Sequence, residues 1–209
     1  MKVILVNGSP NEKGCTFTAL KEVEKTLNEE GIETEIFWIG KQPISGCIAC
    51  GACAQLKKCV INDIVNEFVE KAYTADGFVF GSPVHYAAAS GALTSFMDRA
   101  FFSNRKPERA FIYKPAAAII SARRAGTTAA YDQLNKYFGI NNMPIISSSY
   151  WNMVHGSNPD EVKQDLEGMH TMRMLGRNMA YFLKCIESGK QNRINRPVFE
   201  KKVYTNFIR

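Results

Sequence analysis

The sequence predicts an α/β protein built on a doubly wound, five-stranded parallel sheet with helices on both faces. Short apolar runs rich in β-branched residues alternate along the chain with longer segments whose apolar residues recur every three or four positions. Gly-Ser-Pro turn clusters close the first and third of the apolar runs. Strands that alternate with helices in this way form parallel sheets covered on both faces.

Five segments are predicted as strands: residues 2–6, 34–39, 77–80, 115–121 and 143–147. Five amphipathic segments are predicted as helices: residues 17–30, 62–73, 90–102, 127–138 and 159–188. The last of these has Pro159 near its start and Gly189 after its end, as helices commonly do. Residues 42–58 have neither pattern and are predicted as a loop.

The chain has 209 residues, of which 45% are hydrophobic, and this suits one globular domain with a short appendage. We expect a domain at residues 1–188 and a basic tail at residues 189–209. No apolar run approaches the roughly 18 residues of a membrane span, and no signal peptide is apparent. The sequence therefore predicts a cytoplasmic protein, not bound to a membrane, whose six cysteines stay reduced.

The net charge of +6 is concentrated in the tail, where residues 189–209 hold six basic residues and one acidic residue. The rest of the chain is nearly neutral, so the charge does not indicate nucleic-acid binding. We expect the tail to be solvated or to contact another subunit.

The loop after the first predicted strand, residues 8–18, is rich in Gly, Ser and Thr and leads into a helix. Backbone N–H groups at a helix start bind anions, and this loop has neither the P-loop nor the dinucleotide-binding pattern. A phosphate monoester fits it better. The alternative is an ordinary helix start with Thr16 as its N-cap.

Two further loops follow predicted strands and are expected to lie beside the first. In residues 81–91, a proline turn and an aromatic pair precede small residues, which lets a flat ring approach the main chain. In residues 121–128, Arg123 or Arg124 is expected to bring positive charge to an anionic ligand; the alternative is that both only pair with surface carboxylates.

Four cysteines fall close together in the predicted loop: Cys47, Cys50, Cys53 and Cys59. The first three have the C-x2-C-x2-C spacing of bacterial ferredoxins, and the fourth is near enough to complete the same site. This pattern favours a [4Fe–4S] cluster. A four-thiolate zinc site and a loop without metal are the alternatives.

The Gly-Ser-Pro turn before a Ser/Thr-bearing helix start resembles the NADPH-dependent FMN reductase family. So does Gly-Ser-Pro-Val-His-Tyr followed by Ser-Gly-Ala-Leu-Thr-Ser-Phe-Met-Asp-Arg, and the iron–sulfur flavoprotein branch is the most similar part of that family. The resemblance covers about residues 1–188 and implies a flavodoxin-like fold. It also implies bound FMN, NAD(P)H as co-substrate, a small-molecule electron acceptor and a homodimer or homotetramer.

The same resemblance nominates cofactor-binding residues. The candidates for the FMN phosphate are Ser9, Asn11, Cys15, Thr16 and Thr18, and those along the flavin ring are Pro83, Val84, His85 and Tyr86. Ser121, Arg123 and Arg124 are expected nearby, and no side chain is expected to act as a catalytic nucleophile. In the iron–sulfur branch, cysteines at the spacing found here hold a cluster that takes electrons from ferredoxin.

Two other functions are compatible with the same residues. A non-enzymatic electron carrier would pass electrons only between proteins. A thiol switch would use the four cysteines as a redox sensor.

Overall fold

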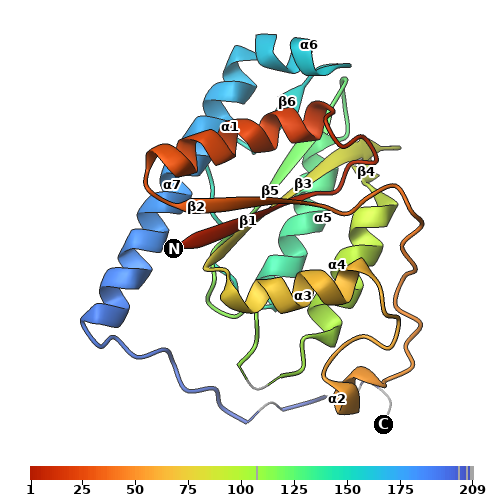
Figure 1. Ribbon diagram of the computed structural model, residues 1–209, viewed down its shortest axis with the longest axis vertical. Coiled ribbons are helices and arrows are strands. Elements are labelled where there is room, and N and C mark those ends of the chain that lie inside the picture. Colours follow the sequence, from red (N-terminus) through yellow and green to blue (C-terminus); the bar gives the residue numbers. More distant parts are fainter. Residues whose placement is uncertain (107, 202, 206, 208–209) are drawn as a thin grey trace.

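The computed structural model describes residues 1–106, 108–201, 203–205 and 207, and its parallel sheet has the order β2-β1-β3-β5-β6 (Figure 1). The strands are β1 (Lys2–Asn7), β2 (Glu33–Trp38), β3 (Gly77–His85), β5 (Ala116–Ala122) and β6 (Met153–His155). A two-residue strand, β4 (Ala88–Ala89), pairs antiparallel with the end of β3. This is the flavodoxin-like order, and it confirms the predicted fold class.

Helices cover both faces of the sheet (Figure 1). Their bounds are α1 (Cys15–Glu29), α2 (Cys53–Leu56), α3 (Ile64–Thr74), α4 (Gly91–Ser103), α5 (Thr127–Ile140), α6 (Pro159–Gln164) and α7 (Leu166–Gln191). Helices α1, α6 and α7 pack on one face, while α3, α4 and α5 pack on the other. In the part of the chain that is described, no helix combines the length and the apolar character needed to cross a membrane.

Alternate residues of each strand enter different cores. In β1, Val3 and Leu5 pack against α1 and α7, whereas Ile4 and Val6 join the core on the opposite face. That second core is rich in aromatic rings, with Phe68 of α3 touching several of them. Strand β1 lies between β2 and β3 and is buried on both faces, which is why its sequence is an almost continuous apolar run.

The fifth parallel strand is not where the sequence predicted it. Residues 143–147 make only an isolated bridge, in which Ile145 pairs with Ala116. The chain then leaves the sheet and returns as Met153–His155, which pairs with the second half of β5. The predicted segment therefore does lie next to β5, but the longer pairing with β5 is made by Met153–His155, further along the chain.

The long C-terminal helix is divided at Asp165. This residue ends α6 and also begins α7, where its side chain accepts the Gly168 N–H. Two other differences are local: β3 continues to His85, and the short helix α2 lies inside the segment predicted as a loop.

The described part of the tail beyond α7 has no helix or strand, although two of its side chains contact Tyr113. Phe199 stacks on that ring with centroids 5.9 Å apart, and the Arg196 guanidinium lies 5.7 Å from its centre. Lys202, Ile208 and Arg209, which contribute to the predicted basic and apolar character of the tail, lie outside the described residues.

Candidate functional site

Asn7, the last residue of β1, shapes the loop that follows it. Its Oδ1 accepts the Ser9 N–H at 3.1 Å and its Nδ2 donates to the Glu12 carbonyl at 2.9 Å. The Ser9 hydroxyl in turn accepts the Asn11 N–H, and Trp38 Nε1 donates to the Ser9 carbonyl. The loop is thus held in place by its own side chains. Asn7 was not predicted as a functional residue, although asparagine before a turn is a recognised signal for such bonding.

The start of α1 has no side-chain cap. Gly14 occupies the N-cap position, and no side chain bonds to the first backbone N–H groups of the helix. Thr16, the alternative cap, lies inside the helix and its Oγ1 is 2.8 Å from the Ser121 hydroxyl of β5. The helix start therefore presents N–H donors at the positive end of the helix dipole, which is a suitable environment for an anion.

Close contacts hold the loop after β1 and the first turns of α1 against strand β3. The Gly8 N–H donates to the Gly81 carbonyl at 2.9 Å. A Cβ atom at Gly81 would lie 2.8 Å from Thr16 Cγ2 and one at Gly8 would lie 2.8 Å from the Gly81 carbonyl oxygen. Glycine is needed at both positions because a side chain would push the loop after β1 and helix α1 away from β3.

A tight hairpin between β3 and β4 forms another wall of this region. Its two central residues, Tyr86 and Ala87, have φ values of 49° and 62°, so they form a turn of the type that joins twisted antiparallel strands. Such turns normally use Asn and Gly, and the left-handed conformation is costly for Tyr and Ala. Gly126, which has φ +90°, makes room for this hairpin at the start of α5.

The segments at the carboxyl ends of β1, β3, β5 and β6 surround a pocket, which lies beside the switch point between β1 and β3. Its lining residues are Ser9, Asn11, Cys15, Thr16, Pro83, Val84, His85, Ser121, Ala122, Arg123, Gly156 and Ser157. Most of the predicted cofactor-binding residues are therefore brought together. The lining has no Asp or Glu, one arginine, several hydroxyl groups and an apolar Pro83–Val84 wall.

Three predicted residues do not line the pocket. Thr18 Oγ1 donates to the Gly14 carbonyl within α1. Tyr86 is fully exposed at the hairpin tip, and Arg124 is exposed after β5. Conversely, Ala122, Gly156 and Ser157 line the pocket although none of them was predicted individually as a cofactor-binding residue. The last two follow β6, whose position had been predicted wrongly.

The thiol of Cys15 is suited to a place beside an anion because it stays neutral. Burial, the largest influence, raises its pKa above the ordinary value. Its Sγ donates to the Gly156 carbonyl at 3.6 Å, which links the start of α1 to the loop after β6. With the uncapped helix start, the hydroxyl groups and Arg123, the pocket fits a phosphorylated ligand such as FMN.

A second pocket contains all four clustered cysteines. Its lining residues are Cys47, Ile48, Cys50, Gly51, Cys53, Cys59, Val60, Ile61, Arg99, Phe102 and Ser103. The thiols come from the segment between β2 and α3, and Cys53 begins α2. Four thiols with no competing carboxylate or imidazole form a donor set that suits iron or zinc. Among the described residues, no three His, Cys, Asp or Glu side chains are arranged to hold a metal ion, so the thiols share a cavity without forming a closed site.

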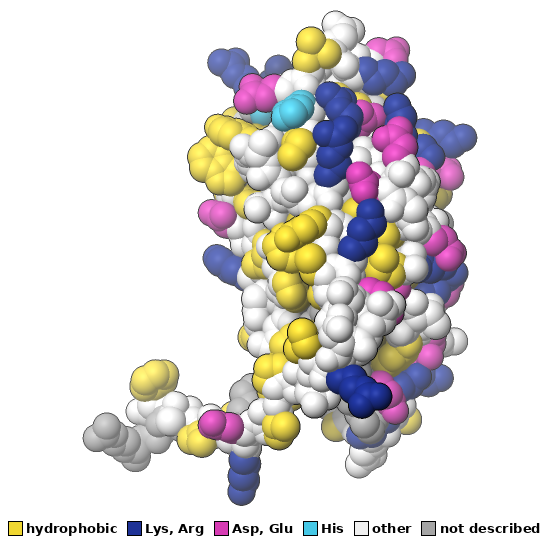
Figure 2. All heavy atoms as spheres, turned by 90° about the vertical axis from the view of Figure 1, so that its left-hand side faces the viewer, with side chains coloured by type: hydrophobic (Ala, Val, Ile, Leu, Met, Phe, Trp, Pro, Cys, Tyr) yellow, Lys and Arg dark blue, Asp and Glu magenta, His cyan; other side chains and the backbone are white. Residues whose placement is uncertain are grey.

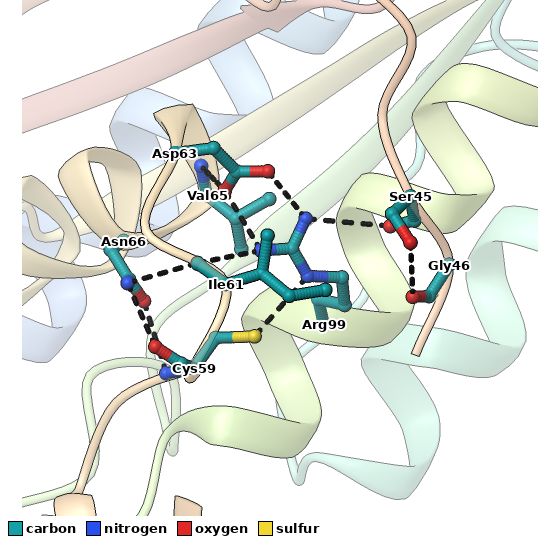
Figure 3. Close-up of polar contacts among 8 residues, drawn as sticks. All are labelled: Ser45, Gly46, Cys59, Ile61, Asp63, Val65, Asn66 and Arg99. Atoms are coloured by element: carbon teal, nitrogen blue, oxygen red, sulfur yellow. Dashed lines mark hydrogen bonds and ion pairs between the residues drawn. The ribbon is translucent and has the colours of Figure 1, made fainter. Parts of the chain in front are cut away.

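Arg99 of α4 lies beside this pocket with its side chain fully buried (Figure 3). Its guanidinium forms a two-pronged ion pair with Asp63, at 2.6 and 2.8 Å, and its Nε donates to Cys59 Sγ at 3.3 Å. Burial lowers the pKa of Arg99, but the bonds to Asp63 and Cys59 outweigh it, so the net shift is upward and the group stays charged. Arg99 is the last residue of the Ser-Gly-Ala-Leu-Thr-Ser-Phe-Met-Asp-Arg motif, and no role was predicted for it.

Comparison with known proteins places the chain among flavoproteins. The sequence profile of the NADPH-dependent FMN reductase family matches residues 1–158. The chain is 32% identical to an iron–sulfur flavoprotein of Methanocaldococcus jannaschii, over 90% of this chain and 100% of that protein. It is 25% identical to an iron–sulfur flavoprotein of Methanosarcina thermophila, over 91% of this chain and 99% of the relative.

Solved structures support the fold. RosB, with a bound 8-demethyl-8-formylriboflavin-5′-phosphate intermediate, has a TM-score of 0.69 and 14% identity, covering 100% of this chain and 93% of its own. A flavodoxin from the domain Archaea has a TM-score of 0.60 and 14% identity, covering 88% of this chain and 99% of its own. At these identities the likeness shows the fold alone.

Proposed function

Because the chain belongs to the NADPH-dependent FMN reductase family, we propose that it passes reducing equivalents from NAD(P)H through FMN to a small-molecule acceptor. Family membership makes the protein an FMN-binding flavin oxidoreductase. The electron donor, the acceptor and the roles of individual residues are the proposal. The observation that carries it is the uncapped start of α1, which opens into a carboxylate-free pocket at the switch point of the sheet.

The pocket residues have separate roles in this proposal. The N–H groups at the start of α1, with the hydroxyls of Ser9 and Thr16, hold the phosphate. The Pro83–Val84 wall lies along the flavin ring, and Arg123 provides positive charge near the developing negative charge of the reduced flavin. Bound FMN supplies the hydride and electron chemistry, so no protein nucleophile is needed.

Titration of the flavin-free protein with FMN and with riboflavin tests the phosphate site. We expect FMN to bind at least about tenfold more tightly, because a charge-assisted contact contributes roughly 1.5–3 kcal/mol. Quenching of flavin fluorescence reports both affinities. Equal affinity for the two flavins would contradict the assignment of the phosphate to the start of α1.

Turnover then separates the enzyme from a simple carrier. We expect the FMN-loaded protein to oxidise NADPH or NADH in the presence of a quinone, a ferric complex or a nitro compound, followed by loss of absorbance of the reduced nucleotide. Reduction only by a protein donor would instead support the electron carrier.

A second function is favoured by the pocket that contains Cys47, Cys50, Cys53 and Cys59. In this alternative, the four thiols hold a [4Fe–4S] cluster and the protein accepts electrons from ferredoxin. The relatives named as iron–sulfur flavoproteins support it. An anaerobic visible spectrum with iron, sulfide and zinc analysis distinguishes a cluster, a zinc ion and a metal-free loop.

We also propose that the protein forms a homodimer or homotetramer. Val198, Val203 and Phe207 of the tail are 94%, 83% and 100% exposed, and Figure 2 shows the tail extending away from the body with hydrophobic side chains along it. Burial of such side chains against another subunit would be favourable. Light scattering that gives the mass of a monomer would contradict this.

A further inference from the structure

The guanidinium of Arg99 has one acceptor for each of its N–H bonds. Nη1 donates to the Ser45 carbonyl and to Asp63 Oδ2, and Nη2 donates to the Ile61 carbonyl and to Asp63 Oδ1. The remaining donor, Nε–H, is directed at Cys59 Sγ (Figure 3). A guanidinium has five such donors, so its position is determined by its contacts on every side.

Cys59 is held more firmly than the other three cysteines of the pocket. The Asn66 side chain accepts its N–H at 3.0 Å and donates to its carbonyl at 2.9 Å, while Arg99 donates to its sulfur. By contrast, Cys47 and Cys50 are exposed, and the Cys53 thiol makes only a 4.0 Å contact with the Phe102 carbonyl. One sulfur of the four therefore has a fixed position and a charged hydrogen-bond donor.

We propose that Arg99 is a positioning residue that fixes the Cys59 sulfur and raises the reduction potential of the group held by the four thiols. This inference rests on the proposed cluster. Reduction adds negative charge, part of which resides on the ligand sulfurs, and hydrogen bonds to these sulfurs stabilise the reduced form. Asp63 opposes the effect because its carboxylate neutralises part of the guanidinium charge.

Two substitutions are expected to shift the potential in opposite directions. Arg99→Lys keeps a positive charge but loses the Nε–H donor and the planar fork, so the potential should become more negative. Asp63→Asn keeps an oxygen that can cap α3 at the Val65 N–H but removes the opposing charge, so the potential should become more positive. A residue that only maintained the fold would not produce shifts of opposite sign.

Arg173→Lys is the matched control. Arg173 of α7 forms an ion pair with Glu22 of α1 at 2.7 Å, on the face of the sheet opposite to α4. It has no contact with a cysteine sulfur in the described structure. We expect its replacement by lysine to leave the potential unchanged.

The experiment is an anaerobic redox titration of the iron-loaded full-length proteins, followed by electron paramagnetic resonance and visible absorbance. Iron and sulfide content and circular dichroism are measured on the same samples. Opposite shifts for Arg99→Lys and Asp63→Asn support the proposal, and an unchanged potential in both overturns it.

If Arg99→Lys is folded but takes up no iron, the test is the potential of Asp63→Asn. A more positive potential supports the proposal, and an unchanged or more negative potential overturns it. If neither folded variant takes up iron, Arg99 serves assembly of the site alone and the proposal is wrong. A wild-type protein that takes up no iron refutes the cluster itself, which is a separate failure.

Discussion

Gly126 shows how little space separates the hairpin of β3 and β4 from the start of α5. A Cβ atom at this position would lie 2.6 Å from Ala87 Cα and 2.9 Å from Val84 Cγ1. The same residue has φ +90°, a conformation that costs roughly 1–2 kcal/mol for residues other than glycine. Val84 lines the pocket at the carboxyl edge of the sheet, so the geometry of that pocket depends on Gly126, which does not itself line it.

Gly126→Ala should therefore destabilise the protein by about 1–3 kcal/mol and also weaken FMN binding, because the hairpin must move. The control is Gly139→Ala in the same helix, where an added Cβ atom meets nothing within 4 Å. That change should stabilise the protein by up to about 1 kcal/mol. Urea denaturation measures both effects. Equal stability of the two variants would show that the hairpin adjusts freely.

Arg123 and Arg124 are adjacent, yet only Arg123 lines the pocket. Arg123→Ala should weaken FMN binding by about tenfold because a charged contact to the flavin is lost, whereas Arg124→Ala should change the affinity less than about twofold. Fluorescence titration of the flavin-free variants gives both constants. The opposite order of effects would reverse the assignment of the two arginines.

At the scale of residues, the sequence predicted those pocket residues that lie at or just after the end of a predicted strand. Ser9, Thr16, Pro83 and Ser121 belong to this group. Asn7 and Arg99 were not predicted, because their importance comes from contacts with Glu12 and Cys59 that only the folded chain creates.

At the scale of elements, Asp165 joins three parts of the molecule. It separates α6 from α7, its Oδ1 accepts the Gly168 N–H at 2.9 Å, and its Oδ2 accepts the His155 N–H of β6 at 2.7 Å. The shortest strand of the parallel sheet is thus tied to the start of the longest helix. The periodic pattern of residues 159–188 continues across this point, which is why the sequence predicted one helix.

Asp165→Ala should destabilise the protein by about 1–3 kcal/mol, since a helix cap and a buried N–H acceptor are lost together. Asp160→Ala is the matched control, because Asp160 is exposed and its side chain pairs only with Lys163 in the described structure. Surface pairs of this kind contribute about 0–1 kcal/mol. Chemical denaturation measures the free energy of unfolding of both variants. A smaller loss for Asp165→Ala than for Asp160→Ala would contradict the conclusion that Asp165 joins β6 to α7.

The fifth parallel strand also lies at a different position from the predicted one, because its pairing with β5 is interrupted. Residues 143–147 are apolar and do reach β5, but the hydrogen bonds continue only after a detour that returns the chain at Asn152, whose carbonyl accepts the Ile120 N–H. A three-residue strand has too few positions for its alternation to be recognised. Sequence patterns therefore predicted a parallel sheet with helices on both faces, but they did not predict where in the sequence this edge strand lies.

For the whole molecule, Lys114 makes stability depend on pH. Its ammonium donates to the Ala72 and Tyr73 carbonyls near the end of α3, at 2.7 and 3.2 Å. Burial is the main cause that lowers its pKa to about 8, and nearby Arg196 and Lys190 add to this while Asp76 opposes it. In the unfolded chain the group has its ordinary pKa of roughly 10.4.

Between these two values the unfolded state binds more protons than the folded state, so the Lys114 contribution to stability rises as the pH rises. Stability of the wild-type protein should therefore increase relative to Lys114→Met between about pH 7 and about pH 9.5. Urea denaturation of the two proteins at both pH values gives their difference in stability at each pH. Titratable groups that the two proteins share contribute equally to both and therefore cancel. A constant difference would mean that Lys114 keeps its ordinary pKa.

The two edges of the sheet also bear on how the protein behaves at high concentration. An exposed edge strand can pair with a strand of another molecule and begin an aggregate. Here β6 offers only three residues for such pairing, and β2 carries Glu33 and Glu35, the second of which is in contact with Lys2. A short edge on one side and a charged edge on the other leave little template for strand addition, which favours a protein that stays dispersed when it is concentrated.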